Sequence, residues 1–379
     1  MLVGCSDDDG ANAPSDTGAE DAQADGGVED ATEDALTPEN VRGFGDLVGV
    51  RTTALQTERG ELTIELWYPA ETRDTADTVF GFMALEAQRQ RYETGLSRAE
   101  SCGTEQTRAT RNADPAAGPA RPLVVMSHCH HCTRFSMYTI AEQLASRGFV
   151  VVAPDHRGNT LFDRWEGNEA PLTTETLDQR TADLRAVIDA VTDGSLDDAI
   201  TPLVDADRIA LVGHSFGSVS VGTIAQSEPR VLAVASLATP MENPLLAGVN
   251  ISDISAPIFF VVADEDNSIS SFGNTFIEQN HEGAADRAWL LRLPDAGHWS
   301  FTNIAGVDAT LQPGCGDDER MTNGANFTYP PVADVTATVA DAVSLFLLDA
   351  VLDVNAAEDA LATWAASQDT LTPPSTEPQ

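Results

Sequence analysis

Residues 205–218 read DADRIALVGHSFGS. The apolar run 209–212 predicts a buried strand, and the small residues from 217 to 226 predict a helix. Between them Ser215 stands two residues from Gly213 and two from Gly217, the pattern G-x-S-x-G. After a strand and before a helix, this pattern is typical of a nucleophile elbow, a strained turn that exposes a serine hydroxyl. The elbow places Ser215 at the carboxyl edge of a sheet.

Strands and helices alternate on both sides of this elbow. We expect strands at GVRTTALQT, ELTIELWYPA, PLVVMSH, FVVVAPDH, RIALVGHS, VLAVASLA, PIFFVVAD and AWLLRLP, and helices over about 136–147, 174–193, 217–226 and 332–352. The short spacing between strands and helices requires right-handed crossovers. The fold class is therefore α/β, with a mostly parallel central sheet and helices on both of its faces.

Composition divides the chain into three parts. Residues 1–40 hold twelve acidic residues, no basic residue and few large apolar side chains, so we expect a disordered tether. Residues 41–353 carry the strands and helices and form the domain. Within it, the polar segment 71–120 reads as an insertion that could cover a site. Residues 354–379 are expected to be the end of the last helix and a loose tail.

The chain is strongly acidic, with a formal net charge of −39 and no lysine. Without residues 1–40 the remainder still carries −27. This charge argues against nucleic acid or an anionic membrane surface as a partner. No stretch approaches the roughly 20 apolar residues of a membrane helix.

The chain opens MLVGCSDDDG, in which Leu2-Val3-Gly4-Cys5 resembles a bacterial lipobox. The basic and long apolar regions of a signal peptide are missing. We expect lipidation at Cys5 and an extracytoplasmic protein, periplasmic or anchored to the bacterial (outer) membrane by this lipid alone. The alternative is a soluble protein with an acidic N-terminus.

A serine hydroxyl needs a base, and the partners of an elbow serine follow in the order acid, then histidine. His298, in PDAGHWSF after a predicted strand, is the expected general base. The strand at 257–262 ends in Ala263-Asp264-Glu265-Asp266. We choose Asp266 as the carboxylate that orients the imidazole, with Asp264 as the alternative.

These motifs resemble the α/β-hydrolases grouped around platelet-activating-factor acetylhydrolases, dienelactone-hydrolase-like esterases and cutinases, over about residues 48–302. LWYPA, PLVVMSHCHH, RGFVVVAPDHRGNT, RTADLRAVIDAV and DADRIALVGHSFGS carry the resemblance. It implies an α/β-hydrolase fold and an acid nine positions after Pro257, which is Asp266. True dienelactone hydrolases use a cysteine nucleophile, so Ser215 implies esterase-like chemistry. Cys129 and Ser218 stand where the group has glycines.

The resemblance also implies an oxyanion hole made of two backbone N–H groups, those of Phe216 and His130. His130 belongs to SHCHHC at 127–132, a cluster of zinc-ligand residue types. Backbone donors leave the side chains free, so the chemistry requires no metal. A zinc-finger-like site lacks a second Cys/His pair at suitable spacing. His156 could complete a metal site or be an ordinary loop histidine.

Apart from Cys5, four cysteines remain, namely Cys102, Cys129, Cys132 and Cys315. An oxidising compartment favours disulfides, and four cysteines allow three pairings. A Cys129–Cys132 bridge would make the oxyanion segment rigid, and the other pairings would tie it to Cys102 and Cys315. Free thiols and a metal site remain alternatives.

The sequence thus predicts a serine carboxylic-ester hydrolase that acts through an acyl-enzyme on Ser215, without a cofactor. Its partner would be a small ester, short-chain or lipid, and its oligomeric state is open. Trp299, Trp165 and Phe301 are candidates for the substrate pocket. The alternatives are a metal-assisted hydrolase that uses residues 128–132, and a non-catalytic surface-binding lipoprotein.

Overall fold

A ten-stranded sheet organises the domain in the computed structural model, which describes residues 37, 40–72, 74–99, 102–312 and 314–375. Cys5 and nearly all of the predicted tether 1–40 lie outside these residues. The strands of the sheet are β1 (Val48–Thr57), β2 (Gly60–Pro69), β3 (Thr110–Arg111), β4 (Arg121–Ser127), β5 (Val150–Pro154), β6 (Val204–His214), β7 (Val231–Leu237), β8 (Ile258–Ala263), β9 (Ala288–Leu293) and β12 (Leu371–Thr372).

The strand order is β12-β9-β8-β7-β6-β4-β5-β2-β1-β3. The six strands from β5 to β9 in this order are mutually parallel, whereas β2 joins β5, β1 joins β2 and β12 joins β9 in antiparallel pairs. The predicted α/β class with a mostly parallel sheet is therefore confirmed. Carboxyl ends of parallel strands meet at one edge, so the loops after β4, β5, β6, β8 and β9 converge there.

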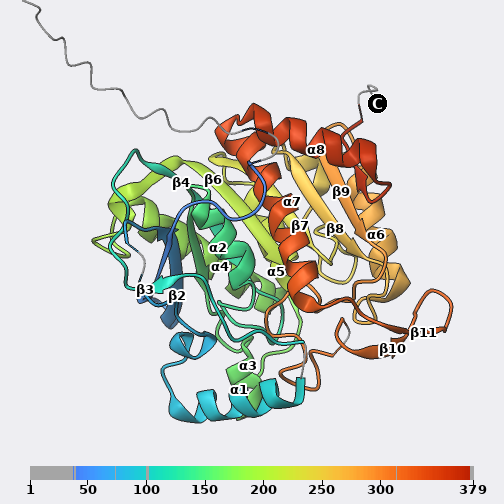
Figure 1. Ribbon diagram of the computed structural model, residues 1–379, viewed down its shortest axis with the longest axis horizontal. Coiled ribbons are helices and arrows are strands. Elements are labelled where there is room, and N and C mark those ends of the chain that lie inside the picture. Colours follow the sequence, from blue (N-terminus) through green and yellow to red (C-terminus); the bar gives the residue numbers. More distant parts are fainter. Residues whose placement is uncertain (1–36, 38–39, 73, 100–101, 313, 376–379) are drawn as a thin grey trace, which may run out of the picture. The chain divides into compact units, whose positions relative to one another are not determined.

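Helices cover both faces of the sheet (Figure 1). One face packs against α2 (Tyr138–Ser146), α7 (Val332–Leu352) and α8 (Asn355–Ser367), the other against α4 (Thr174–Thr192), α5 (Phe216–Ala225) and α6 (Ser270–Glu282). Side chains alternate between the faces along each strand. On β4, Val124 and Met126 join the core under α2 and α7, and Leu123 and Val125 join the core under α4 and α5.

Residues 354–375 are more ordered than the helix end and loose tail expected at 354–379. Residues 355–367 form α8, and residues 371–372 pair with β9 as an edge strand. Ala357, Leu361 and Trp364 recur at helical spacing and are buried in the core. The expectation that no stretch approaches the length of a membrane helix is corrected by the neighbouring α7, which is long and apolar enough to cross a membrane. Because 67% of its most apolar window is buried, α7 is a core helix.

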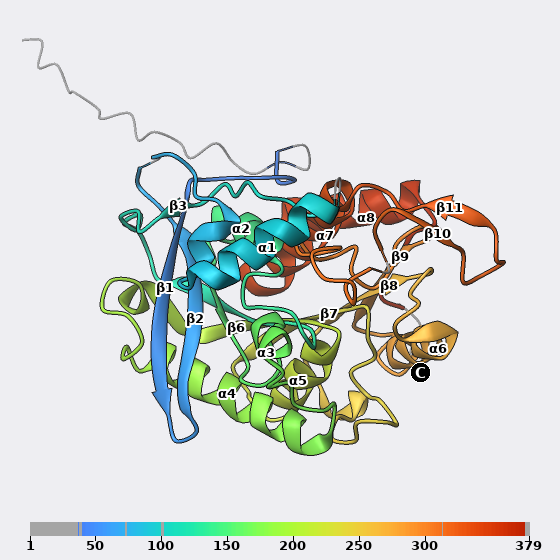
Figure 2. The same ribbon diagram turned by 90° about the horizontal axis from the view of Figure 1, so that it is seen from below.

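The insertion 71–120 is more ordered than its polar sequence indicates. It contains η1 (Val79–Phe82), α1 (Glu86–Ala99) and the edge strand β3. Tyr92 of α1 packs against Phe80 and Phe135, and the Cys102–Cys315 disulfide ties the segment to the loops after β9. Figures 1 and 2 show α1 beyond the same sheet edge as α3 (Leu161–Glu166). Shorter elements are η2 (Thr201–Leu203), η3 (Ile251–Asp253), β10 (Asp317–Glu319) and β11 (Asn326–Thr328).

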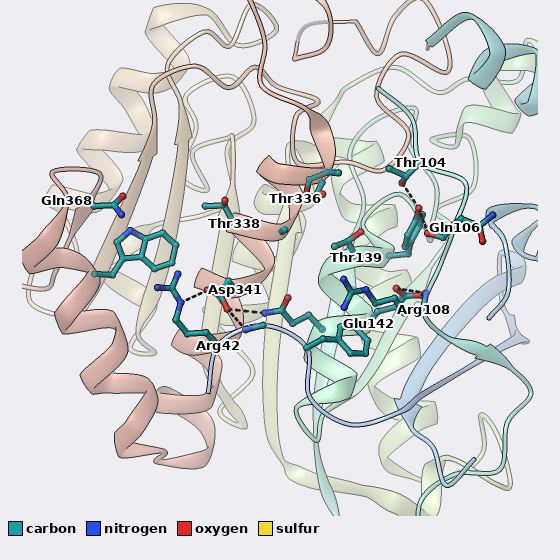
Figure 3. Close-up of a pocket in the computed structure, with 17 residues that line it drawn as sticks. Arg42, Thr104, Gln106, Arg108, Thr139, Glu142, Thr336, Thr338, Asp341 and Gln368 are labelled. Carbon is teal, nitrogen blue, oxygen red and sulfur yellow. Dashed lines mark hydrogen bonds and ion pairs between the residues drawn. The ribbon is translucent and has the colours of Figure 1, made fainter. Parts of the chain in front are cut away.

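A cavity of about 630 Å³ opens on the α2–α7 face. Figure 3 shows Arg42 paired with Asp341 of α7 on one side and Glu142 of α2 on the other. Glu142 is buried and accepts the backbone N–H groups of Arg108 and Ala109 at 3.0 Å. Burial nonetheless raises the pKa of the Glu142 carboxyl to about 7, because the two N–H groups only partly offset the loss of water.

The buried Glu142 carboxyl should make stability fall as pH rises. In the unfolded chain its pKa is the ordinary 4.5, and in the folded protein about 7. Between these values the folded state binds more protons, so stability is fully present below pH 4.5 and is lost as pH rises through 7. The expected loss is about 3 kcal/mol. The free energy of unfolding in urea, measured at several pH values, tests this prediction. Glu142→Gln should lack this loss of stability, whereas the control Glu86→Gln, at an exposed position, should keep it. Parallel curves for wild type and Glu142→Gln would refute the assignment.

Candidate active site

Ser215 lies on a strained turn between β6 and α5. Its φ of 56° and ψ of −123° are rare for a residue with a side chain, and its N–H donates to the Leu237 carbonyl at 2.9 Å. The two elbow glycines make the turn possible. A Cβ on Gly213 would lie 2.5 Å from the Gly217 carbonyl carbon, and one on Gly217 would collide with the Ser127 carbonyl at the end of β4. Close packing of backbone on backbone therefore sets the position of the Ser215 hydroxyl.

Three side chains from separate loops form a continuous hydrogen-bonded chain. His298 Nε2 lies 2.8 Å from Ser215 Oγ, and His298 Nδ1 lies 2.7 Å from Asp266 Oδ2. Asp266 is wholly buried, and its Oδ1 accepts the N–H groups of Ser268 and Ile269 at 2.9 and 3.1 Å. These two amides hold the carboxylate in one orientation. Ser215 itself stays partly exposed, so the open end of this chain faces the solvent.

The other two carboxylates after β8 have different partners. Asp264, the alternative acid, forms an ion pair with Arg292 on β9. Glu265 is buried and accepts from Thr322 Oγ1 at 2.7 Å. Neither reaches the imidazole of His298. The structure therefore brings Asp266, rather than Asp264, together with His298.

The segment after β4 lies beside the elbow. The ring of His130 contacts the ring of Phe216 edge-on, with 6.3 Å between their centroids. Phe216 is the first residue of α5, where backbone N–H groups have no partner within the helix. Across the residues described here, the backbone N–H groups of His130 and Phe216 have no protein acceptor. Both amides are thus free to bind an oxygen near Ser215.

The histidines of segment 127–132 turn toward different partners. His128 is buried, and its Nε2 accepts the backbone N–H of His156 at 3.1 Å. Burial, His131 and Arg180 lower the pKa of His130 to about 4. The ring of His128 lies 2.6 Å from the Cys129 carbonyl, and the ring of His130 lies 3.1 Å from Asn159 Oδ1. The ring of His131 lies 3.2 Å from Glu169 Oε2. This divergence gives no shared centre for a metal held by the three histidines.

His156, considered above as a fourth ligand, uses both ring nitrogens elsewhere. Its Nδ1 donates to Asp183 Oδ2 and its Nε2 accepts from Ser127 Oγ, both at 3.1 Å. Burial and the nearby guanidinium of Arg180 hold its pKa well below the ordinary value. This second Ser–His–Asp arrangement is buried throughout. These contacts hold the N-terminal end of segment 127–132 in place, and His156 is not a free ligand.

Arg180 of α4 is a residue of the site that sequence reasoning missed. Its wholly buried guanidinium donates to the His128 carbonyl, to Ser127 Oγ at 3.0 Å and to Ser220 Oγ at 3.1 Å. The same guanidinium lies 4.8 Å from the centroid of the Phe216 ring. Arg180 thus contacts both segments that offer a free backbone N–H. The only signal in the sequence was an arginine on an otherwise apolar helix face.

The four cysteines in the described part of the chain form two disulfides, Cys102–Cys315 and Cys129–Cys132, with Cα–Cα distances of 5.5 and 5.1 Å. Of the three possible pairings, the structure has the one that closes a small ring within segment 127–132. The free-thiol alternative does not hold in this structure. Cys129 therefore replaces the usual glycine with a covalent link across the loop.

The other departure, Ser218, is accommodated without an unpaired hydroxyl. Its Oγ donates to the Gly213 carbonyl at 2.9 Å in the interior of the elbow.

The three aromatic residues predicted for a pocket lie in different settings. Phe301 is wholly buried and packs edge-on against His214, so it is a core residue rather than part of a pocket wall. Trp299 packs edge-on against both His214 and His298 and is 7% exposed. Trp165 of α3 is half-buried, and its Nε1 donates to Asp308 at 3.0 Å. Of the three, Trp165 offers the most surface to a substrate.

Two family models match the sequence. Residues 109–311 match the dienelactone hydrolase family, and residues 48–166 match platelet-activating factor acetylhydrolase, isoform II.

Individual relatives are similar at low identity. The chain is 24% identical to platelet-activating factor acetylhydrolase of Bos taurus, covering 52% of this chain and 54% of the relative. It is 27% identical to cutinase est1 of Thermobifida alba, covering 57% of this chain and 66% of the relative. The match therefore spans about half to two thirds of these relatives. A solved structure, ferulic acid esterase from Streptomyces cinnamoneus, has the same fold, with a TM-score of 0.58, 24% identity, and coverage of 81% of this chain and 91% of that one.

Proposed function

Because the chain belongs to the dienelactone hydrolase family, we propose that it is a serine carboxylic-ester hydrolase that works through an acyl-enzyme on Ser215. The observation that carries this proposal is the chain of contacts from Ser215 Oγ to His298, at 2.8 Å, and from His298 to Asp266, at 2.7 Å. A buried carboxylate, an imidazole and a hydroxyl in this order form the arrangement that activates a serine. The ester-hydrolysing relatives support the same chemistry.

Acylation begins when Ser215 Oγ attacks the ester carbonyl. The Oγ–C bond forms while the hydroxyl proton moves to His298 Nε2, and Asp266 stabilises the resulting imidazolium through Nδ1–H. The carbonyl oxygen becomes an oxyanion, and the free N–H groups of His130 and Phe216 are placed to bind it. A donor of this kind contributes about 3–4 kcal/mol in other enzymes. The bond to the alcohol then breaks, and His298 gives its proton to the leaving oxygen.

Deacylation repeats these steps with water. His298 takes a proton from the water as its oxygen attacks the acyl carbon, and it returns the proton to Ser215 Oγ when the acid leaves. Every proton that His298 accepts is thus released in the same half-reaction. The chemistry needs no organic cofactor and no metal at the three histidines of segment 127–132.

We expect Arg180→Met to reduce kcat by about 10- to 100-fold, because a displaced oxyanion donor should lose only part of the roughly 3–4 kcal/mol that removing such a donor costs in other enzymes. Methionine fills much of the space but cannot hold the His128 carbonyl. KM should change little, since Arg180 itself does not reach the solvent-facing end of Ser215. Steady-state kinetics test this, with urea unfolding to confirm the fold and Arg185→Met on the same helix as a control. An equal kcat for Arg180→Met and wild type would show that the segment holds its shape without the guanidinium.

The substrate is proposed to be a short-chain or lipid ester. Hydrolysis of p-nitrophenyl esters of two to sixteen carbons, by the full chain with and without EDTA, tests the function and ranks acyl lengths. Turnover that EDTA does not change supports the serine mechanism. Loss of turnover with EDTA would instead favour a metal-assisted hydrolase, and no turnover of any ester would favour the non-catalytic binding protein. Covalent labelling of Ser215 by a fluorophosphonate, seen by peptide mass spectrometry, separates a catalytic serine from these alternatives.

The proposed location is extracytoplasmic, with a lipid on Cys5. Two disulfides in the domain are consistent with an oxidising compartment. Labelling with an alkyne fatty acid in a bacterial host, lost in Cys5→Ser, would test the anchor, and equal labelling of both proteins would refute it.

A further inference from the structure

His214, inside the elbow motif, has one ring nitrogen that the proposed ester chemistry does not use. Its Nε2 lies 2.9 Å from the backbone carbonyl of His298. A carbonyl can only accept, so Nε2 carries the proton and donates it. In a neutral imidazole the other nitrogen, Nδ1, then holds a lone pair. His214 is wholly buried, and its Nδ1 has no hydrogen-bond partner among the residues described here.

The Cys129–Cys132 disulfide lies next to this imidazole. A ligand atom of His214 and the two sulfur atoms all lie within 4.8 Å of one another, and all three residues are buried. An imidazole that binds a metal usually donates its other N–H to a carbonyl or carboxylate, which sets the tautomer. His214 already makes that contact with the His298 carbonyl. The lone pair of His214 Nδ1 is therefore free to bind a metal ion. The two sulfur atoms can act as thiolate ligands only after the disulfide bond between them is reduced.

We propose that reduction of the Cys129–Cys132 bridge creates a binding site for copper(I), made of the two cysteine thiolates and His214 Nδ1. A phosphine supplies the two electrons: the S–S bond breaks, two thiols form, and the phosphine becomes its oxide with an oxygen from water. Binding of Cu⁺ then displaces one proton from each thiol. The site uses none of the residues Ser215, His298 and Asp266 as a ligand, and copper binding does not depend on ester hydrolysis.

Copper(I) fits this donor set better than zinc does. Thiolates select soft cations such as copper(I) and zinc. Structural zinc sites are almost always four-coordinate, whereas the cluster in the described part of the chain has three ligands in a buried environment. With metal–sulfur bonds of about 2.3 Å, two thiolates in a trigonal set lie about 4 Å apart. The two sulfur atoms are bonded to each other in the present structure. Opening the bridge must therefore roughly double their separation from the ~2 Å of a disulfide to that spacing.

The test uses the full chain reduced with a phosphine under argon and titrated with copper(I) against the chromophoric chelator bicinchoninate. Free-thiol counts and circular dichroism first establish that the bridge opens while the fold persists. We expect one copper per chain, a thiolate-to-copper absorption band in the near ultraviolet, and no binding to the oxidised protein. The Cys102→Ser/Cys315→Ser variant, which keeps only the Cys129–Cys132 bridge, should bind the same amount.

Variants at the site decide whether these three residues are the ligands. Cys129→Ser/Cys132→Ser, which keeps the other bridge and Cys5, should lose the band and at least 100-fold in affinity. His214→Gln keeps both thiols and should weaken binding by at least 10-fold. Undiminished binding in Cys129→Ser/Cys132→Ser would overturn the proposal, as would a bridge that opens only on unfolding. Tighter binding of zinc than of copper(I) would overturn the choice of metal.

Discussion

Replacement of Ser215 by alanine is expected to lower kcat for p-nitrophenyl esters by about 10⁴- to 10⁶-fold, as loss of a triad nucleophile does in other serine hydrolases. His298 and Asp266 would remain in place, but no atom would be left to form the acyl bond. Stability should change by less than about 1 kcal/mol, because alanine keeps the Cβ and so the same backbone strain at a φ of 56°.

The measurement is steady-state kinetics at equal concentrations of folded protein, with urea unfolding of the same preparations. The matched control is Ser271→Ala, an exposed serine on α6, which should keep wild-type kcat and labelling by the fluorophosphonate. If Ser215→Ala retained a tenth of the activity or more, the esterase reaction would have to proceed at another group, and the acyl-enzyme proposal would fall.

Replacement of Asp266 by asparagine is expected to lower kcat by about 10⁴-fold, with little change in the fold. The N–H groups of Ser268 and Ile269 bind Oδ1 in the native protein. They would hold the asparagine oxygen and turn its NH₂ group toward His298 Nδ1. Nδ1 would then have to accept a hydrogen bond, so the proton would reside on Nε2. An Nε2 that carries a proton cannot take the one from Ser215.

Asp264→Asn is the control for this change, two residues away on the same loop. It removes the carboxylate partner of Arg292 and should leave kcat within a few-fold of wild type, since exposed or half-exposed ion pairs contribute little. The opposite ranking, with Asp264→Asn as the inactive variant, would make Asp264 the orienting acid and would contradict the contact between Asp266 and His298.

The copper(I) site and the ester chemistry meet at one residue. His214 Nε2 donates to the carbonyl of His298, so the elbow and the loop of the proposed general base are joined through that imidazole. The failure of either proposal leaves the other intact, since copper binding is measured by stoichiometry and absorption, and ester hydrolysis by turnover of the oxidised protein.

Local patterns in the sequence were sufficient for the elbow and for most of the sheet. The elbow needs glycines at 213 and 217, so its whole pattern lies within five consecutive residues. Apolar runs of four to seven residues indicate β4 to β9 directly. Segments whose order depends on distant contacts were missed. The insertion helix α1 is polar along its length and is held by Phe135 and by the Cys102–Cys315 bridge. Residues 371–372 became a strand only because β9 has a free edge.

The sequence by itself determined the α/β class and the nucleophile-elbow motif at Ser215, because each follows from residues close together in the chain. It predicted His298 and Asp266 as the partners of Ser215, with Asp264 as the alternative acid, and only the structure shows Asp266 in contact with His298. Only the tertiary structure decided how the cysteines pair, where His128, His130 and His131 point, and that Arg180 binds the His128 carbonyl from 52 residues away. The physical reason is that a side chain's partners are set by which strand ends meet at the sheet edge. That meeting is a property of the whole folded chain and leaves no local pattern.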